Sequence, residues 1–329
     1  MTDSKRLLVV TRRLPLPVES RATRDYVLRC NVDDRLYSAD DLVAAAEDAD
    51  ALLITPQDRL TADTLSRLSS TVRAIATLSV GFDHIDLRAA AARGIVVTNT
   101  PDVLTDATAD LTMLLLLGAS RRASEGQEMV RAGIWNDPRP TELLGWQLTG
   151  KTLGVYGMGR IGQAVAHRAR AFGMSIHYTN RRRLSGELER GAVFHADARE
   201  LLQVSQFLTL HAPATRETSR FLNATTISLL PKGAVVVNAA RGSLVDDDAL
   251  IAGLRSGHVA AAGLDVYDGE PHVRPEYCAL PNTFLLPHLG SATVETRTRM
   301  GMVALENLDA VFADKAPPNP VTLGVAPTS

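Results

Sequence analysis

The sequence predicts an α/β protein made of two doubly wound domains, each a parallel sheet with helices on both faces. Short apolar segments alternate with amphipathic segments along most of the 329 residues. A complete G-x-G-x-x-G pattern at residues 157–162 directly follows one of the apolar segments. The chain is also long enough for about two domains, each able to bury a core of its own.

Residues 1–100 alternate strand-like and helix-like segments. We expect strands at residues 6–11, 51–55, 73–78 and 95–99. Asp40 opens a helix to residue 48, Thr61 caps a helix ending at residue 68, and Asp86 caps a helix that Gly94 stops. Residues 14–17 read Leu-Pro-Leu-Pro, and we expect a loop there because proline cannot pair in a sheet. This part predicts one small α/β domain.

A second alternation begins after a boundary at residues 100–102. We expect one long helix over residues 105–131, then a loop rich in tryptophan and proline. Further strands are expected at residues 153–156, 175–179, 207–210, 234–238, 259–264 and 282–286. Helices are expected from the glycine motif to Phe172, over residues 246–255 and over residues 292–312, with an irregular tail from residue 316. Since the last helix can return to the first domain, residues 101–288 form an insert between residues 1–100 and 289–329.

The composition is that of a globular protein, with 45% apolar and 22% charged residues. A formal net charge of −2 without a long basic block gives no electrostatic basis for nucleic acid or membrane partners. The first residues lack the apolar core of a signal peptide, and the most apolar run, residues 111–119, is too short to span a bilayer. We expect a cytoplasmic protein without a metal site, in which Cys30 and Cys278 are free, buried thiols.

The glycine motif predicts a dinucleotide site. It reads Gly157-Met158-Gly159-Arg160-Ile161-Gly162 and leads into an amphipathic segment. In such a site the first glycine permits a tight turn, the second lets the backbone approach a pyrophosphate, and the third lets helix pack on strand. The helix N-terminus adds unpaired N–H groups and partial positive charge. A purely structural turn is the alternative, but the strand, helix and second strand around the motif favour a cofactor.

The residues after the next strand indicate which dinucleotide is bound. An acidic residue about twenty positions after the motif would bind the ribose 2′-hydroxyl of NAD. This chain instead has Asn180-Arg181-Arg182-Arg183. Asparagine removes the repulsion that a 2′-phosphate would meet, and guanidinium groups match phosphate oxygens. We therefore expect NADP(H) to be preferred and NAD(H) tolerated, with Arg181 the main contact; a solvated basic loop is the alternative.

Three side chains after separate strands suggest chemistry on a 2-oxo acid. Reducing such an acid requires a cation for the carboxylate, a proton donor and a group that orients the donor. Arg241, Glu270 and His288 supply these types, each after its own strand. A carboxylate on one ring nitrogen of histidine fixes the tautomer and favours the protonated ring. His167 and His177, by contrast, lie in predicted elements without partners, and His84 beside Asp83 is a weak catalytic candidate.

Around these residues the chain resembles the D-isomer-specific 2-hydroxyacid dehydrogenases. The similar stretches are residues 238–242 (NAARG), 263–266 (GLDV) with Glu270-Pro271, and 286–288 (LPH). Within that family, residues 101–105, 159–164, 179–181 and 288–293 are most similar to glyoxylate/hydroxypyruvate reductases. The resemblance covers nearly the whole chain in the right order. It implies a Rossmann dinucleotide-binding domain inserted into a smaller, flavodoxin-like substrate domain.

The resemblance also implies residue roles. His288 is the acid/base, Glu270 its partner and Arg241 the substrate clamp, while Asp265 lies by the nicotinamide carboxamide. The expected substrate-binding residues are Val80 and Gly81 through their backbone N–H groups, Arg241, His288 and Ser291. The expected cofactor-binding residues are Gly157, Met158, Gly159, Arg160, Ile161, Gly162, Asn180, Arg181, Arg182, His211, Pro213, Ala239, Ala240, Arg241, Asp265, His288 and Gly290. The family is generally homodimeric, with the segment around residues 105–148 embracing the partner.

The expected function is NADPH-dependent reduction of glyoxylate or hydroxypyruvate to glycolate or D-glycerate, with His288 as proton donor. Pro138 stands where some members have a tryptophan that reaches the neighbouring subunit's site, which weakens a preference for hydroxypyruvate. A larger 2-oxo acid, of the phenylpyruvate or 2-ketogluconate type, is the nearer alternative. A dinucleotide-sensing binding protein or corepressor on the same fold is the remote one.

Overall fold

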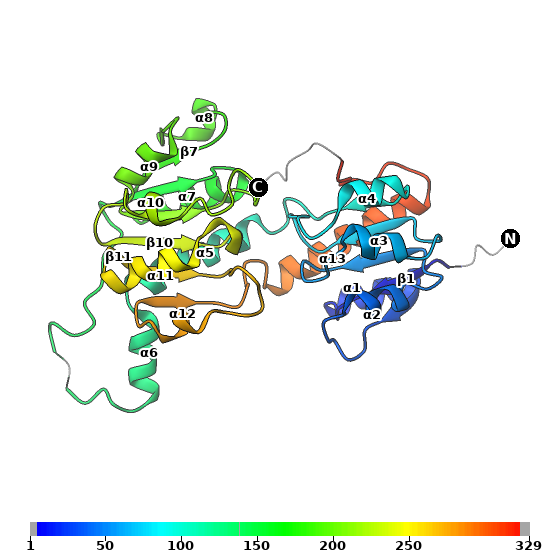
Figure 1. Ribbon diagram of the computed structural model, residues 1–329, viewed down its shortest axis with the longest axis horizontal. Coiled ribbons are helices and arrows are strands. Elements are labelled where there is room, and N and C mark those ends of the chain that lie inside the picture. Colours follow the sequence, from blue (N-terminus) through cyan, green and yellow to red (C-terminus); the bar gives the residue numbers. More distant parts are fainter. Residues whose placement is uncertain (1–4, 138, 323–329) are drawn as a thin grey trace. The chain divides into compact units, whose positions relative to one another are not determined.

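The computed structural model describes residues 5–137 and 139–322, and Pro138 lies outside the described residues (Figure 1). The chain divides into two compact units. The described part of unit 1 comprises residues 5–104 and 292–322, and unit 2 is Thr105–Ser291. Each unit contains one parallel sheet, which confirms the α/β fold class.

Unit 1 is built on a five-stranded sheet in the order β2-β1-β3-β4-β5, the flavodoxin-like order. Its strands are β1 (Leu7–Val10), β2 (Val27–Cys30), β3 (Ala51–Ile54), β4 (Ala74–Thr77) and β5 (Val96–Thr98). Its helices are α1 (Leu16–Asp25), α2 (Ala39–Ala45), α3 (Ala62–Arg67), α4 (Leu87–Ala92) and α13 (Val294–Phe312). Thr61 and Asp86 cap α3 and α4 through their side chains, as expected.

Two apolar layers cover the two faces of this sheet. Leu42, Leu65 and Ala90 of α2, α3 and α4 pack on one face. Helices α1 and α13 pack on the other. Figure 1 shows the orange α13 beside the blue α1, and the Tyr26 hydroxyl donates to Asp309 Oδ1 of α13 at 2.5 Å. The C-terminal part of the chain is therefore an integral layer of unit 1.

The expectation of a loop at residues 14–17 holds for Leu14 and Pro15 and is wrong for Leu16 and Pro17. Helix α1 begins at Leu16, with Pro15 at its N-cap and Pro17 in its first turn. Proline is tolerated there because first-turn N–H groups have no partner within the helix, and its fixed φ suits helix entry. The following strand β2 was not expected; it is a short edge strand without a fully buried residue. Cys30 ends this strand and is exposed, as is Cys278, so the expected burial of both thiols is also wrong.

Unit 2 contains a seven-stranded sheet in the order β12-β11-β10-β9-β6-β7-β8. Counted from β6, this is the Rossmann order 3-2-1-4-5-6 with one further parallel strand. The strands are β6 (Thr152–Tyr156), β7 (Ser175–Thr179), β8 (Val193–Phe194), β9 (Phe207–Leu210), β10 (Ala234–Asn238), β11 (Val259–Leu264) and β12 (Thr283–Leu285). The α-helices are α5 (Thr105–Ser120), α6 (Ala123–Arg131), α7 (Arg160–Ala171), α8 (Gly186–Glu189), α9 (Ala198–Val204), α10 (Ala224–Ile227), α11 (Asp247–Ser256) and α12 (Pro275–Ala279).

Helices cover both faces of this second sheet. Buried residues of α5 and α7 pack against one face, and those of α9, α10 and α11 against the other. A Cβ on Gly263 of β11 would lie 2.8 Å from the Leu115 carbonyl oxygen, so α5 lies very close to the strand there. None of the described helices is both long and apolar enough to cross a membrane.

The single long helix expected over residues 105–131 is two helices. The break falls at Arg122, whose φ of 54° lies in the left-handed region. Its guanidinium pairs with Glu125 of α6 through contacts of 2.7 and 2.6 Å. The apolar periodicity continues past Arg122, so the sequence pattern could not reveal the break. Helix α6 has no buried residue, whereas α5 is largely buried.

Candidate active site

The glycine motif lies between β6 and α7, and its first and third glycines have no room for a side chain. A Cβ on Gly157 would lie 2.5 Å from Ala212 N, and one on Gly162 would lie 2.5 Å from Gly157 O. Gly157 also has a φ of 94°, a conformation open to glycine. Gly159 caps α7 without a side chain, and no acidic residue lies in the first turn. The N–H groups of this turn are therefore suited to an anion such as a pyrophosphate.

His211 adds an observation that fits a bound group beside this motif. Its backbone N–H donates to Tyr156 O, which holds it next to Gly157. Its Nε2 lies 2.9 Å from Thr209 Oγ1, but its buried Nδ1 has no partner among the described residues. Burial lowers the pKa of His211 to about 4, so the ring is neutral near pH 7 and is no proton donor. A polar atom of a cofactor would satisfy the orphaned nitrogen.

The basic residues after β7 are not equivalent. Arg181 and Arg182 are exposed. The Arg183 guanidinium instead donates to both carboxylate oxygens of Glu189, at 2.8 and 3.1 Å. Arg183 is exposed as well, with 66% of its side chain accessible, but its guanidinium is already engaged by Glu189. Arg181 and Arg182 are therefore the stronger candidates for contact with a 2′-phosphate.

The Arg183–Glu189 pair belongs to a network that sequence reasoning did not find. The Tyr178 hydroxyl donates to Glu189 Oε1 at 2.6 Å and accepts from Leu184 N. These bonds shape the loop that presents Arg181 and Arg182. Nothing in the sequence spacing distinguishes Glu189 from its exposed acidic neighbour Glu187.

His288 and Glu270 form the central contact of the candidate site. His288 Nδ1 lies 2.6 Å from Glu270 Oε2, and Tyr267 N donates to Glu270 Oε1 at 3.3 Å. A carboxylate only accepts, so the short contact assigns the donated proton to Nδ1 and leaves Nε2 on the other side of the ring. About 31% of the His288 side chain and 21% of the Glu270 side chain are exposed, so the pair is open to a ligand.

Asp265, at the end of β11, holds the loop that carries His288. Its fully buried carboxylate accepts from Leu289 N at 2.7 Å and Gly290 N at 2.9 Å. Its own carbonyl accepts from His288 N. Burial raises the pKa of Asp265. The two N–H donors and the nearby His288 act in the opposite direction and only partly offset this effect. His288 has a φ of 55°, in the left-handed region that is unfavourable for a non-glycine residue. The hydrogen bonds of residues 288–290 to Asp265 hold the backbone in this conformation.

Arg241 follows β10, the strand next to β11. Asn238 braces its backbone, donating from Nδ2 to Arg241 O at 2.9 Å, and the guanidinium donates to Ala240 O at 2.8 Å. The next residue, Gly242, is pressed against the segment that leads to Glu270, because a Cβ there would lie 1.9 Å from the Tyr267 carbonyl carbon. The loops that carry Arg241 and Glu270 therefore touch.

The predicted site residues are divided between the two units. Unit 2 holds all of them except Val80 and Gly81. These two follow β4 in unit 1, where Val80 O accepts from Asn99 Nδ2 and Gly81 O accepts from Ser79 Oγ. The proposed part of these residues in substrate binding stays a prediction. Pro213, Ala239 and Ser291 lie on loops after β9 and β10 and after His288.

The expectation that His177 has no partner is wrong. Its Nδ1 lies 2.9 Å from Nε2 of His195, with the two ring centroids 5.2 Å apart. His177 is in β7, and His195 directly follows β8, a strand that is not among those expected from the sequence. Burial and the neighbouring ring lower the pKa of His177. Within residues 5–137 and 139–322, no three histidine, cysteine or acidic side chains gather as metal ligands.

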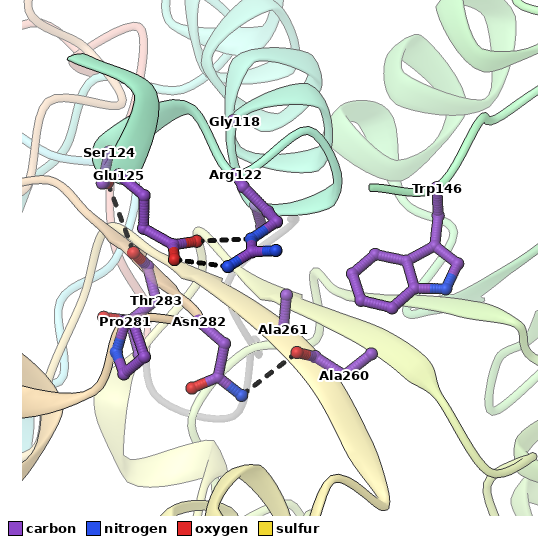
Figure 2. Close-up of a pocket in the computed structure, with 11 residues that line it drawn as sticks. Gly118, Arg122, Ser124, Glu125, Trp146, Ala260, Ala261, Pro281, Asn282 and Thr283 are labelled. Atoms are coloured by element: carbon purple, nitrogen blue, oxygen red, sulfur yellow. Dashed lines mark hydrogen bonds and ion pairs between the residues drawn. The ribbon is translucent and has the colours of Figure 1, made fainter. Parts of the chain in front are cut away.

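A pocket of about 210 Å³ lies elsewhere in unit 2, between α5 and α6 and the beginnings of β11 and β12 (Figure 2). Figure 2 shows the Arg122–Glu125 ion pair at one side of it and Trp146 at another. Ligands of open α/β sheets bind at the carboxyl ends of the strands, where Arg241, Glu270 and His288 lie. None of the predicted site residues lines this pocket, so it is not the candidate active site.

Comparisons with known proteins point to one family. A family model described as "D-isomer specific 2-hydroxyacid dehydrogenase, NAD binding domain" matches residues 113–290. A glycerate dehydrogenase of Hyphomicrobium methylovorum is 46% identical over 94% of this chain and 97% of its own length. A glyoxylate reductase of Thermococcus litoralis is 39% identical over 97% and 98% of the two chains.

A solved structure agrees with these relatives. It is an NADPH-dependent glyoxylate/hydroxypyruvate reductase from Sinorhizobium meliloti in complex with NADP and malonate. It is 33% identical to this chain, covers 97% of each chain, and superposes with a TM-score of 0.85.

Proposed function

The chain belongs to the D-isomer-specific 2-hydroxyacid dehydrogenases, and on that basis we propose that it reduces glyoxylate or hydroxypyruvate with NADPH. The observation that carries the proposal is the 2.6 Å contact between His288 Nδ1 and Glu270 Oε2, in the same unit as the glycine motif. The relatives named glycerate dehydrogenase and glyoxylate reductase support a small 2-oxo acid, because oxidation of glycerate at C2 gives hydroxypyruvate.

The residues of unit 2 would hold the dinucleotide. The N–H groups at the start of α7 bind its pyrophosphate, and Arg181 with Arg182 binds the 2′-phosphate. Further contacts would come from the loops that follow β9 and β10. These loops carry His211, with its unpartnered Nδ1, and Pro213, Ala239 and Ala240. When bound, NADPH supplies the hydride that the carbonyl carbon of the substrate receives.

The remaining steps belong to side chains of this chain. Arg241 grips the substrate carboxylate with its planar fork, assisted by the Val80 and Gly81 N–H groups and by Ser291. His288 delivers a proton from Nε2 to the carbonyl oxygen as it becomes a hydroxyl. Glu270 holds the imidazole by Nδ1, and Asp265 holds the loop beneath it. A cytoplasmic location stays a prediction.

Steady-state oxidation of NADPH and of NADH tests the proposal, each with glyoxylate, hydroxypyruvate, pyruvate and phenylpyruvate. We expect the highest kcat/KM for glyoxylate or hydroxypyruvate with NADPH. Turnover of phenylpyruvate alone would reject the small substrate and retain the reaction type. No turnover on any of the four acids would contradict the proposal and favour a binding protein.

The Arg181→Gln variant tests the cofactor preference. Loss of one charge-assisted contact to the 2′-phosphate should raise KM for NADPH by about tenfold. KM for NADH should stay within about twofold, because NADH carries a hydroxyl there. Arg199→Gln, an exposed arginine at the start of α9, is the matched control and should change neither value. If the ratio of KM for NADPH to KM for NADH in Arg181→Gln equals that of the wild type, the basic loop is merely solvated.

We also propose that two copies of the chain form a homodimer through the segment that begins at α6. Helix α6 buries no residue in the single chain. More than half of each of Val130, Ile134, Trp135 and Leu144 is exposed. Exposed large apolar side chains concentrated in one segment are typical of protein interfaces. A second copy would cover it.

Light scattering after size exclusion tests the dimer. The wild type should have about twice the mass of one chain. Ile134→Asp should lower the measured mass to that of one chain, because a buried, unpaired charge is costly at an interface. Val32→Asp places the same charge on an exposed apolar residue of unit 1 and should leave the mass unchanged. A monomeric wild type at micromolar concentration would reject the dimer.

A further inference from the structure

The geometry points to Asn180 as a positioning residue for the glycine motif rather than as a reader of the ribose 2′ group. This inference rests on the proposed function only in that a nicotinamide dinucleotide binds at residues 157–162. It assigns to Asn180 an effect on the part of the cofactor that NADPH and NADH share. The discrimination between the two then falls to its neighbours.

Two hydrogen bonds join the Asn180 carboxamide to a single residue of the motif. Met158 N donates to Asn180 Oδ1 at 2.6 Å, and Asn180 Nδ2 donates to Met158 O at 3.3 Å. Met158 lies between the first two glycines, and its side chain is fully buried. The carboxamide therefore clamps both polar backbone groups of the residue at the centre of the turn. Among the described residues, Asn180 is the side chain that accepts from Met158 N.

The clamp requires a side chain that both accepts and donates. A carboxamide provides a carbonyl oxygen and an NH₂ group in one plane, and an ionised carboxylate provides acceptors only. An aspartate at position 180 could keep the bond from Met158 N. It would, however, place a negatively charged oxygen against Met158 O. The acidic residue typical of NAD sites at this point of the fold is thus not interchangeable with Asn180 here.

The neighbours of Asn180 have separate tasks. All three arginines after Asn180 are exposed, but the Arg183 guanidinium is already paired with the carboxylate of Glu189. The 2′-phosphate is accordingly recognised by Arg181 and Arg182, one and two residues beyond the clamp. The glycine turn and the basic loop are connected through Asn180, yet they act on different groups of the cofactor.

The test measures dissociation constants of NADPH and NADH by calorimetry, without any 2-oxo acid, for wild type, Asn180→Ala and Asn180→Asp. Leaving Met158 N without a partner should weaken both cofactors by about tenfold in Asn180→Ala, with their ratio unchanged. Asn180→Asp should also weaken both and bring no gain for NADH. Under turnover, KM for both cofactors should rise while kcat stays within twofold, a split that general loss of folding would not produce.

Asn282→Ala is the matched control. It removes a carboxamide with two bonds to backbone carbonyls, Leu254 O and Ala260 O, near the other edge of the sheet. It should leave both dissociation constants unchanged.

Tighter NADH binding in Asn180→Asp, or a loss of affinity for NADPH alone in Asn180→Ala, would overturn the inference. Either result would show that Asn180 contacts the ribose 2′ group. Unchanged binding of both cofactors in Asn180→Ala would overturn it as well. In those outcomes the wild type still binds the dinucleotide, so the proposed function survives. A wild type that binds neither cofactor would instead reject the proposed function, and this inference with it.

Discussion

The His288→Ala variant is expected to lose about a thousandfold in kcat, within the range that general acid catalysis contributes. His288 is the side chain whose Nδ1 contacts Glu270 at 2.6 Å, which leaves Nε2 to donate to the substrate oxygen. Without the imidazole, the new alkoxide must take its proton from water. Steady-state kinetics at saturating NADPH and glyoxylate measure the loss.

Cofactor binding should be nearly unchanged in His288→Ala. The pyrophosphate cradle at α7 and the basic loop after β7 do not include His288. The dissociation constant of NADPH in His288→Ala should therefore stay within about twofold of wild type. His272→Ala removes an exposed histidine two residues after Glu270 and should change neither quantity. Turnover of His288→Ala close to that of the wild type would overturn the assignment of the proton donor.

Arg241→Gln should lower kcat/KM for glyoxylate by about a thousandfold, because a bidentate, charge-assisted grip on a carboxylate is lost in a partly desolvated site. The glutamine keeps much of the side-chain length and can donate one hydrogen bond, but it carries no charge. The Asn238 brace and the tight contact of Gly242 with Tyr267 involve backbone atoms and should remain. The fold of the loop is thus expected to be retained.

The control for this variant is Arg255→Gln, an exposed arginine in the last turn of α11, which should retain wild-type kinetics. Added guanidinium ion should restore part of the activity of Arg241→Gln, since it can occupy the vacated position. An unchanged KM for glyoxylate in Arg241→Gln would assign the carboxylate to other groups. Val80 and Gly81 would then be the next candidates to examine.

Local patterns in the sequence were sufficient for much of the fold. The strands at residues 175–179, 207–210, 234–238 and 259–264 were predicted with their observed bounds. Thr61 and Asp86 cap helices as expected, because a capping side chain bonds N–H groups two or three residues away. The caps are contacts within a few residues, and most of these strands are short, largely apolar runs between turn residues, so both features can be recognised locally in the sequence.

The errors occur where the local signal was weak or ambiguous. Pro15 and Pro17 suggested a loop, although proline is equally suited to a helix start. The apolar pattern ran through Arg122, although the backbone turns there. Strand β8 consists of only two residues, Val193 and Phe194, which is too short for a recognisable strand pattern, so the partner of His177 was not predicted.

The sequence by itself determined the fold class, the glycine motif and the order in which Arg241, Glu270 and His288 follow their strands. Only the tertiary structure decided which side chains meet. Glu270 and His288 are 18 residues apart, Met158 and Asn180 are 22 apart, and Asp265 and Gly290 are 25 apart. Such contacts depend on the register of parallel strands and on the path of the crossovers between them, and both arise from packing the whole sheet between its helices.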